Sequence, residues 1–166
     1  AAARDLKHIS LELGGKSPLI IFDDCDLDQA VNIAMNANFF SQGEVCSNGT
    51  RIFVQEKIYD AFVDRFVART QEIKIGDPFD PQTKMGALIS PEHLNRVLDF
   101  IESGKEQGAK ILTGGYKPQF ENLSNSKIKN GNFLSPTIFT NVHDEMDIAK
   151  NEIFGPVACI FKFQTE

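Results

Sequence analysis

The stretch Phe39-Phe40-Ser41-Gln42-Gly43-Glu44-Val45-Cys46-Ser47-Asn48-Gly49-Thr50-Arg51 places a single cysteine among small and polar residues. A cysteine that serves only packing is found more often inside an apolar run. The neighbouring glycines leave the sulfur open to a small molecule and let backbone N–H groups approach a ligand closely. The stretch is therefore typical of a nucleophilic thiol with backbone donors for an oxyanion. A glycine-rich turn that holds a cysteine by chance has the same composition, so the stretch alone leaves both interpretations open.

A second stretch, Leu11-Glu12-Leu13-Gly14-Gly15-Lys16-Ser17-Pro18, sets one carboxylate between two leucines and before a double glycine. An apolar setting suits a carboxylate for general-base work near neutral pH. An exposed glutamate at the end of a strand is the simpler interpretation of Glu12. A third stretch, Asn151-Glu152-Ile153-Phe154-Gly155-Pro156-Val157, is by itself only a turn before an apolar run.

Taken together and in this order, the three stretches resemble the aldehyde dehydrogenase superfamily. The motifs Glu-Leu-Gly-Gly-Lys, Gln-Gly-x-x-Cys and Glu-Ile-Phe-Gly-Pro form the pattern of that family, and the resemblance covers essentially the whole chain. Residues 46–51 are most similar to the betaine aldehyde and trimethylaminobutyraldehyde branch. Two positions depart from the usual pattern, because Glu44 replaces a common glutamine and Ala87 a common proline. The charge of Glu44, two residues from the thiol, disfavours the thiolate.

The resemblance implies an enzyme that oxidises an aldehyde to a carboxylate with NAD or NADP, and betaine aldehyde is the expected substrate. It implies that Cys46 attacks the carbonyl, with its own backbone N–H holding the oxyanion, and becomes a thioester. Glu12 then activates the water that hydrolyses this thioester.

The resemblance also implies which residues contact the cofactor and the substrate. The expected cofactor contacts are Glu152 at the nicotinamide ribose, Phe154 beside the nicotinamide ring, and the backbone of Leu13 and Gly14. His93 occupies a position near the adenosine side in relatives. Phe40 and Val45 are expected to line the aldehyde channel, where an aromatic wall attracts a trimethylammonium group. The sequence shows no metal site, although relatives of the betaine aldehyde type bind potassium near the glutamate motif.

Three alternative functions remain open at this point. A coenzyme-A-acylating or semialdehyde dehydrogenase of the same superfamily is disfavoured by Glu12, because enzymes that hydrolyse their own thioester need that base. A non-enzymatic protein that reuses the fold has no physical need for both Glu12 and Cys46. A cysteine hydrolase needs a histidine near the thiol, and His8, His93 and His143 lie in no supporting motif.

Alternating strand and helix patterns predict an α/β domain with a mostly parallel sheet flanked by helices, the catalytic domain of the aldehyde dehydrogenase fold. Helical spacing predicts a helix from Leu27 that leads to the cysteine stretch and two more helices over 56–74 and 91–107. The carboxylates of Asp23-Asp24-Cys25-Asp26 are expected to cap the first of these helices, and Ser90 the third. A polar loop is predicted over 116–132. Apolar runs predict strands over 6–13, 18–22, 51–55, 109–113, 133–142 and 157–163.

Composition limits the compartment and the partners. With 166 residues, 42% of them hydrophobic, the chain is long enough for one domain with a sizeable core. The net charge of −6 argues against nucleic acid and anionic membranes as partners. Three cysteines without a Cys-x-x-Cys pair, and no signal-like segment, fit a reducing cytoplasm.

The resemblance also predicts how the chain relates to a complete enzyme. Residues 1–166 correspond to a partial catalytic domain, in which 1–13 form the end of the cofactor-binding half or its linker. A Rossmann-like cofactor half and an oligomerisation tail are expected outside this sequence, and the complete enzyme is expected to be a homodimer or homotetramer. The fragment alone is therefore expected to be inactive.

Overall fold

The computed structural model describes residues 2–120 and 126–165, and its centre is a five-stranded sheet. The strands are β1 (Pro18–Ile21), β2 (Arg51–Gln55), β3 (Lys110–Thr113), β4 (Thr137–Thr140) and β5 (Val157–Phe163). They lie in the order β1-β2-β5-β4-β3, and only the pair of β3 with β4 is antiparallel. The prediction of a mostly parallel sheet is confirmed.

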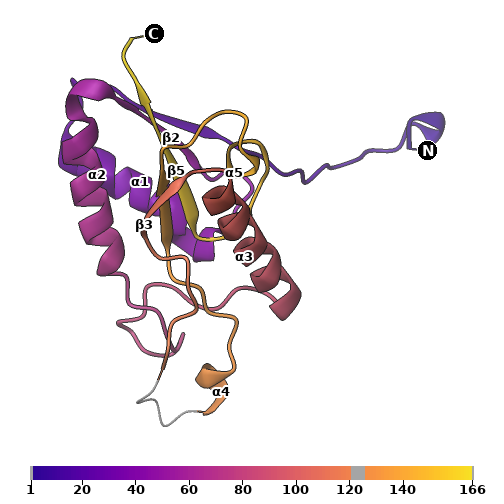
Figure 1. Cartoon of the computed structure of the whole chain (residues 1–166). Coiled ribbons are helices and arrows are strands. Elements are labelled where there is room, and N and C mark those ends of the chain that lie inside the picture. Colours follow the sequence, from indigo (N-terminus) through magenta and orange to yellow (C-terminus); the bar gives the residue numbers. More distant parts are fainter. Residues whose placement is uncertain (1, 121–125, 166) are drawn as a thin grey trace.

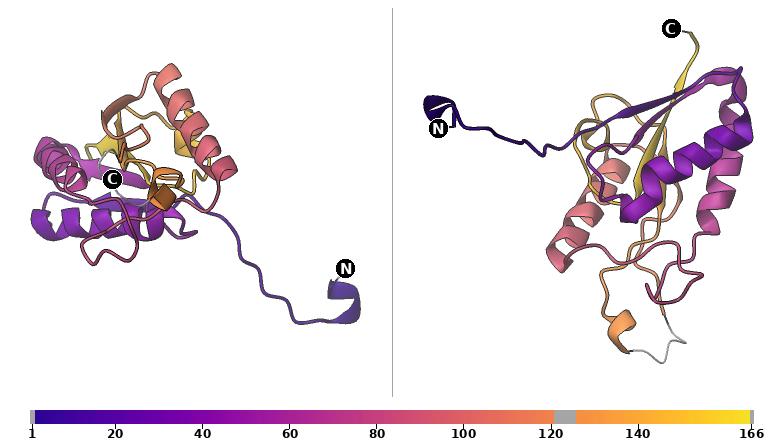
Figure 2. Two further views of the ribbon diagram at one scale, coloured as in Figure 1. Left: turned by 90° about the horizontal axis from the view of Figure 1, so that it is seen from below. Right: turned by 180° about the vertical axis from the view of Figure 1, so that it is seen from behind.

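Helices cover both faces of this sheet (Figure 1), as the views from below and behind also show (Figure 2). Helices α1 (Leu27–Phe39) and α2 (Glu56–Gln71) pack on one face, and α3 (Pro91–Glu106) packs with α5 (Asp147–Lys150) on the other. The remaining helices are short, and they are α4 (Ser126–Lys129) and the 3₁₀ helices η1 (Ala2–Asp5) and η2 (Phe40–Gly43).

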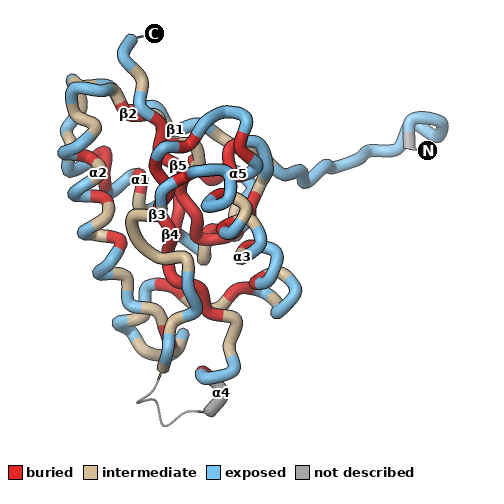
Figure 3. The backbone as a smooth tube through the Cα atoms, in the orientation of Figure 1, coloured by how far each residue is buried: buried red, intermediate tan, exposed pale blue. Residues whose placement is uncertain are grey.

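Strand β5 shows how one apolar run serves two cores. Val157, Cys159 and Phe161 face the cluster under α3, whereas Ala158 and Ile160 face the cluster under α1 and α2. All five side chains are buried, and Figure 3 shows this burial along the middle of the molecule. Alternate residues of a strand point to opposite faces, so a central parallel strand needs apolar residues at every position.

The predicted helix boundaries are largely confirmed by their caps. Asp26 is the N-cap of α1, and its carboxylate accepts a hydrogen bond from the Gln29 backbone N–H at 3.0 Å. Ser90 caps α3 and accepts from the His93 N–H at 3.1 Å. Helix α2 ends at Gln71 rather than at position 74. Each cap satisfies an N–H that has no partner inside its own helix.

At the start of the chain, the strand predicted over 6–13 is absent, and the strand predicted over 18–22 is present but less buried than its apolar run suggests. Residues 6–13 form no strand but an exposed extended segment that projects from the body (Figure 1), with Leu6 89% and Leu11 68% exposed. The partial alternation of apolar residues has no neighbouring strand with which to pair. The run 18–22 is a strand but not a buried one, because β1 is the edge of the sheet and leaves Ile20 55% exposed.

Other differences have local causes. The predicted strand over 133–142 pairs only from Thr137, because Pro136 has no N–H to donate to a ladder. The predicted loop over 116–132 contains the one-turn helix α4, and its residues 121–125 lie outside the described residues. Within residues 2–120 and 126–165, no helix has the length and apolar character needed to cross a membrane.

Candidate active site

The chain leaves α1 through a sharp left-handed turn. Ser41, Gln42 and Gly43 have φ angles of 50°, 57° and 76°. Non-glycine residues rarely adopt this conformation, and it persists only where the surrounding structure holds it, as at active sites. Nearby, Nδ2 of Asn38 donates to the carbonyls of Ala34 at 2.9 Å and of Gly49 at 3.4 Å. The end of α1 and the far end of the cysteine loop are thereby tied together.

Cys46 lies on a tight turn at the surface of the domain. The Asn48 N–H donates to the Val45 carbonyl at 3.2 Å and closes the turn. The residue Cys46 is exposed, and its N–H makes no hydrogen bond to another residue within the described part of the chain. A free N–H next to an exposed sulfur is the local geometry that an oxyanion on a sulfur-bound carbon requires.

The other two cysteines are less exposed than Cys46. Cys159 is fully buried in β5, and burial raises the pKa of its thiol to about 11. Burial also raises the pKa of Cys25, which is partly exposed. Because the thiolate is the nucleophile, Cys46 is the thiol whose surroundings suit chemistry.

The double glycine joins the first motif to the other two. A Cβ atom on Gly14 would lie 2.0 Å from Oε2 of Glu152, and one on Gly15 would lie 2.8 Å from the Cys46 carbonyl oxygen. Any side chain at these positions would displace the carboxylate or the cysteine turn. The two glycines therefore let three distant segments of the chain approach within contact distance.

The third motif packs on the cysteine loop from the other side. A Cβ atom on Gly43 would lie 2.2 Å from the Gly155 carbonyl oxygen. Phe154 has a φ of 58°, and its carbonyl lies 2.6 Å from Nε2 of His93. The same nitrogen lies 3.5 Å from Oε1 of Glu44. His93 thus links the turn of the third motif to the cysteine loop.

These segments enclose one hollow of about 700 Å³. It contains most of the predicted catalytic, cofactor and channel residues, namely Glu12, Leu13, Gly14, Val45, Cys46, Glu152 and Phe154. Four further lining residues are Glu44, Ile89, His93 and Arg96. The thiol and the two carboxylates expected to act on substrate, water and cofactor therefore face a common space.

Phe40 is the predicted channel residue that this hollow does not contain. Its side chain is 70% exposed and lines a separate hollow with Phe39, Ile73 and Lys84. The left-handed turn that follows Phe40 carries the chain from this position to the cysteine. A role of Phe40 in an aldehyde channel stays a prediction.

The setting of Glu12 differs from the expected one. The flanking leucines do not enclose its carboxylate, because Leu11 is 68% and Leu13 is 69% exposed. The segment 6–13 carries Glu12 to the edge of the hollow from outside the body of the domain. In the described structure the carboxylate is therefore open to solvent rather than in an apolar environment.

Sequence reasoning gave little weight to the residues that α3 contributes. His93 and Arg96 are three positions apart and share one helix face, a spacing visible in the sequence. The orientation of that face toward Cys46 depends on the packing of α3 against the sheet, so spacing alone does not place them at the site.

Glu152 and Phe154 fit the sugar and ring of a nicotinamide cofactor. Oε1 of Glu152 is buried and has no hydrogen-bond partner within the described residues. A buried carboxylate oxygen without a donor is unfavourable, and a hydroxyl of a bound ribose would supply one. The Phe154 residue is 37% exposed and lines the same hollow. Among the described residues, no group of three or more histidine, cysteine, aspartate or glutamate side chains is placed to hold a metal ion.

Sequence comparison places the whole chain in one family. The model of the aldehyde dehydrogenase family matches residues 1–166. The betaine aldehyde dehydrogenase of Sinorhizobium fredii is 52% identical over 166 residues, which cover 100% of this chain and 33% of that protein. The human 4-trimethylaminobutyraldehyde dehydrogenase is 52% identical over 167 residues, with 99% of this chain and 33% of that protein covered. The chain thus spans about a third of the length of these relatives.

Solved structures agree with the sequence comparison. A betaine aldehyde dehydrogenase variant from Staphylococcus aureus in complex with NAD⁺ superposes with a TM-score of 0.90 at 43% identity, covering 99% of this chain and 32% of that one. The NAD⁺ complex of an aldehyde dehydrogenase from Bacillus cereus gives a TM-score of 0.89 at 41% identity, with the same coverage. From its motifs, its fold and these matches, the chain belongs to the aldehyde dehydrogenase family.

Proposed function

We propose that this chain carries the catalytic residues of an NAD- or NADP-dependent aldehyde dehydrogenase that works through a thioester on Cys46. The observation that supports this most is the shared hollow of Glu12, Cys46 and Glu152, which come from three distant segments. In this proposal residues 1–13 lead from a cofactor-binding half into the catalytic domain.

Cys46 performs the first step. Its thiolate attacks the aldehyde carbon, a carbon–sulfur bond forms, and the carbonyl oxygen becomes an oxyanion. The Cys46 backbone N–H, which makes no other hydrogen bond within the described residues, donates to that oxyanion. The same turn therefore supplies both the nucleophile and one stabilising donor.

Glu152 and Phe154 hold the cofactor beside Cys46, with Leu13 and Gly14 lining it through their backbone. A nicotinamide cofactor held there would supply the two-electron oxidant, and loss of hydride from the adduct carbon would leave a thioester on Cys46. Glu152 orients the cofactor by accepting a hydrogen bond from the ribose on its free Oε1. The Phe154 ring restricts where the nicotinamide can lie.

Glu12 completes the cycle. Its carboxylate takes a proton from a water molecule, and the hydroxide equivalent attacks the thioester carbon. The carbon–sulfur bond breaks, the carboxylate product leaves, and Cys46 is again a thiolate. The solvent-open position of Glu12 gives the water a direct route to this base.

A cationic aldehyde such as betaine aldehyde suits the charge of this hollow. Glu12, Glu44 and Glu152 line it. Among the described residues that line this hollow, Arg96 is the one permanently cationic residue. A site of net negative charge attracts a trimethylammonium group and raises its local concentration. The two curated relatives described above are named for aldehydes that carry this group.

One observation bears on the hydrolase alternative. His93 does line the hollow of Cys46, but its Nε2 lies 2.6 Å from the Phe154 carbonyl. A ring nitrogen that donates to a carbonyl does not accept a proton from the thiol. Nε2 of His93 is therefore not the base that a Cys–His hydrolase needs, and such an enzyme would have to use Nδ1 instead.

The test uses a chimera in which this chain replaces the matching third of the Sinorhizobium fredii enzyme. We expect reduction of NAD with betaine aldehyde and a lower kcat/KM with 3,3-dimethylbutanal, its uncharged isostere. A chimera that folds by circular dichroism and binds NAD, but reduces it with neither aldehyde, would contradict the proposal. The choice between NAD and NADP and the oligomeric state stay predictions, because the cofactor-binding half and the tail of the chimera come from the relative. Potassium dependence, also still a prediction, is measured on the chimera.

A further inference from the structure

Lys16 ends the Glu-Leu-Gly-Gly-Lys motif but has no part in the chemistry proposed above. Its Nζ is buried and has no hydrogen-bond partner within the described residues. Burial lowers the pKa of Lys16 from its ordinary value. The nearby charge of Glu152 acts in the opposite direction and raises the pKa of Lys16, but burial has the larger effect. A buried ammonium without a hydrogen-bonded counter-charge is costly, and an anion within reach removes that cost.

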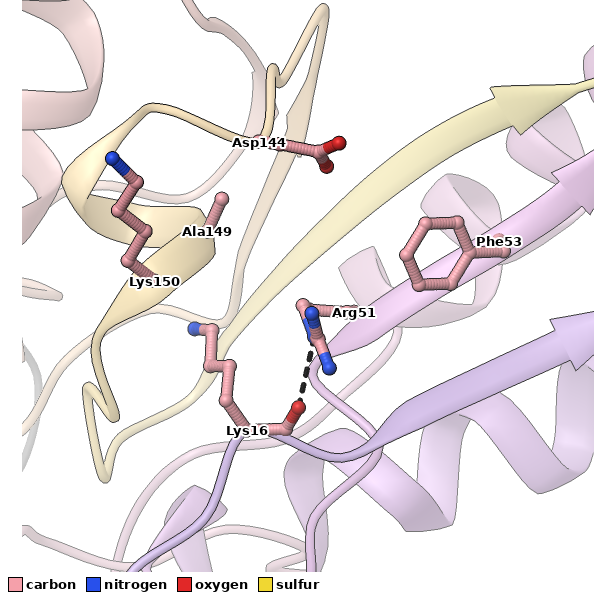
Figure 4. A pocket seen from close by; sticks show the side chains of 6 residues that line it. All are labelled: Lys16, Arg51, Phe53, Asp144, Ala149 and Lys150. Atoms are coloured by element: carbon pink, nitrogen blue, oxygen red, sulfur yellow. Dashed lines mark hydrogen bonds between the residues drawn. The ribbon is translucent and has the colours of Figure 1, made fainter.

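Lys16 borders a second hollow, of about 580 Å³, which shares no residue with the hollow of Cys46. Figure 4 shows Lys16 and Arg51 on one side of it and residues 144–150, which include α5, on the other. Its lining residues are Lys16, Arg51, Phe53, Asp144, Ala149 and Lys150. The space is large enough for a ligand of several atoms beyond its charged group.

Lys16 and Arg51 are held together as a pair of cations. Nε of Arg51 donates to the Lys16 carbonyl oxygen at 2.8 Å, drawn as the dashed line in Figure 4. The guanidinium carbon lies 6.0 Å from the ring centroid of Phe53. Lys150, by contrast, is already paired with Glu145. Lys16 and Arg51 are therefore the lining cations that make no salt bridge to a carboxylate within the described residues.

The remaining lining residues define the anion. Asp144 places one negative charge across the hollow and disfavours a dianion more than a monoanion. Phe53 and Ala149 offer apolar surface next to the cations. A guanidinium and an ammonium side by side suit the two oxygens of a carboxylate.

We propose that this hollow binds a carboxylate between Lys16 and Arg51, with the carbon skeleton of its bearer against Phe53 and Ala149. The carboxylate has two sources, a free small molecule or an acidic side chain of a protein segment outside this chain. The inference does not depend on the proposed oxidation, because no residue of the Cys46 hollow takes part in it.

Calorimetric titration of this chain with benzoate tests the site, and benzamide serves as the uncharged probe of the same shape. We expect saturable benzoate binding and at least tenfold weaker binding of benzamide. Lys16→Met should weaken benzoate binding by roughly tenfold, the effect of one charge-assisted hydrogen bond. Lys110→Met, which removes an exposed lysine of β3, is the matched control and should change nothing.

A second readout reports on Lys16 directly. Because a carboxylate favours the charged ammonium, saturating benzoate should raise the pKa of Lys16 measured by NMR of its ε-carbon. Equal affinity for benzamide, an unchanged Lys16 titration, or full affinity in a folded Lys16→Met variant would overturn the proposal.

The chimera described above separates the two sources. A free ligand is indicated if benzoate binds the chain and the chimera alike. A protein carboxylate is indicated by two results together. Benzoate binds the isolated chain but not the chimera, and the thermal stability of the chimera is lowered by Lys16→Met but not by Lys110→Met. Absence of binding to the chain would overturn both versions.

Discussion

The two charged ends of the Glu-Leu-Gly-Gly-Lys motif line different hollows. Glu12 lines the hollow of Cys46, and Lys16 lines the second hollow, which differs from the first in charge. The charged residues that line the hollow of Cys46 are three glutamates and one arginine, whereas those that line the hollow of Lys16 are three cations and one aspartate. Between them, Gly14 and Gly15 leave room for the Glu152 carboxylate and the Cys46 carbonyl. One short motif therefore contributes to two sites with different chemistry, and substitutions should affect each site separately.

The largest expected effect is that of Cys46→Ala in the chimera. Without the sulfur no covalent adduct forms, so cofactor reduction should fall on the order of 10⁶-fold, as when other catalytic nucleophiles are removed. Stopped-flow absorbance of the reduced cofactor measures this. The same substitution in the isolated chain should leave benzoate affinity at the Lys16 hollow at its wild-type value. If the variant kept even a tenth of the wild-type turnover, the assignment of the covalent chemistry to the hollow of Cys46 would be wrong.

Gly43→Ala should disrupt the Cys46 hollow through the backbone. Its φ of 76° and the 2.2 Å approach of the Gly155 carbonyl oxygen leave no room for a methyl group. We expect a loss of about 1–3 kcal/mol in the free energy of unfolding, measured by urea titration of the chain. Gly76→Ala is the control, because its Cβ atom would make an ordinary 3.5 Å contact with Thr83 Oγ1. Equal losses in both variants would show that the contact with Gly155 is not needed.

The three thiols should react at different rates with iodoacetamide. Cys46 should be labelled first because it is exposed, and Cys159 last because burial raises its pKa to about 11. At pH 8 a thiol of that pKa is thiolate in only about one part per thousand. Peptide mapping by mass spectrometry gives the order. If Cys159 were labelled before Cys46, the assignment of the nucleophile would be wrong.

The smallest expected effect concerns the pH dependence of stability. Burial lowers the pKa of Lys16 from 10.5, so between the folded-state pKa and 10.5 the unfolded chain binds more protons than the folded chain. The titration of Lys16 therefore makes the free energy of unfolding rise with pH over that window. Above pH 10.5 Lys16 is neutral in both states, and the cost of burying its ammonium is absent. The free energy of unfolding, measured with urea at pH 7 and pH 10, should rise less or fall more between these two pH values for Lys16→Met than for wild type. Identical slopes would mean that the ammonium is not buried in solution.

Much of the fold and site follows from the sequence because both depend on local patterns. Apolar runs identify β2 and β5, and the ordered motifs identify Cys46 and Glu152 as residues of a common site. The path of Phe40 could not be predicted, because Ser41 and Gln42 adopt left-handed angles for which their residue types give no signal.

The errors at the start of the chain have a related cause. Alternation over 6–13 is compatible with a strand, but a strand also needs a neighbour, and pairing is a property of the whole fold. The exposure of Leu11 and Leu13 beside Glu12 follows from the same lack of a packing partner.

The most direct test of the proposed mechanism is the Glu12→Gln variant of the chimera, mixed rapidly with NAD and betaine aldehyde and quenched in acid. The mechanism predicts a burst of about one reduced cofactor per active site, then a stall, with the acyl group on the Cys46 peptide in the mass spectrum. Unchanged steady turnover, or a burst that leaves Cys46 unmodified, would contradict the assignment of Cys46 as nucleophile and Glu12 as the base that frees it.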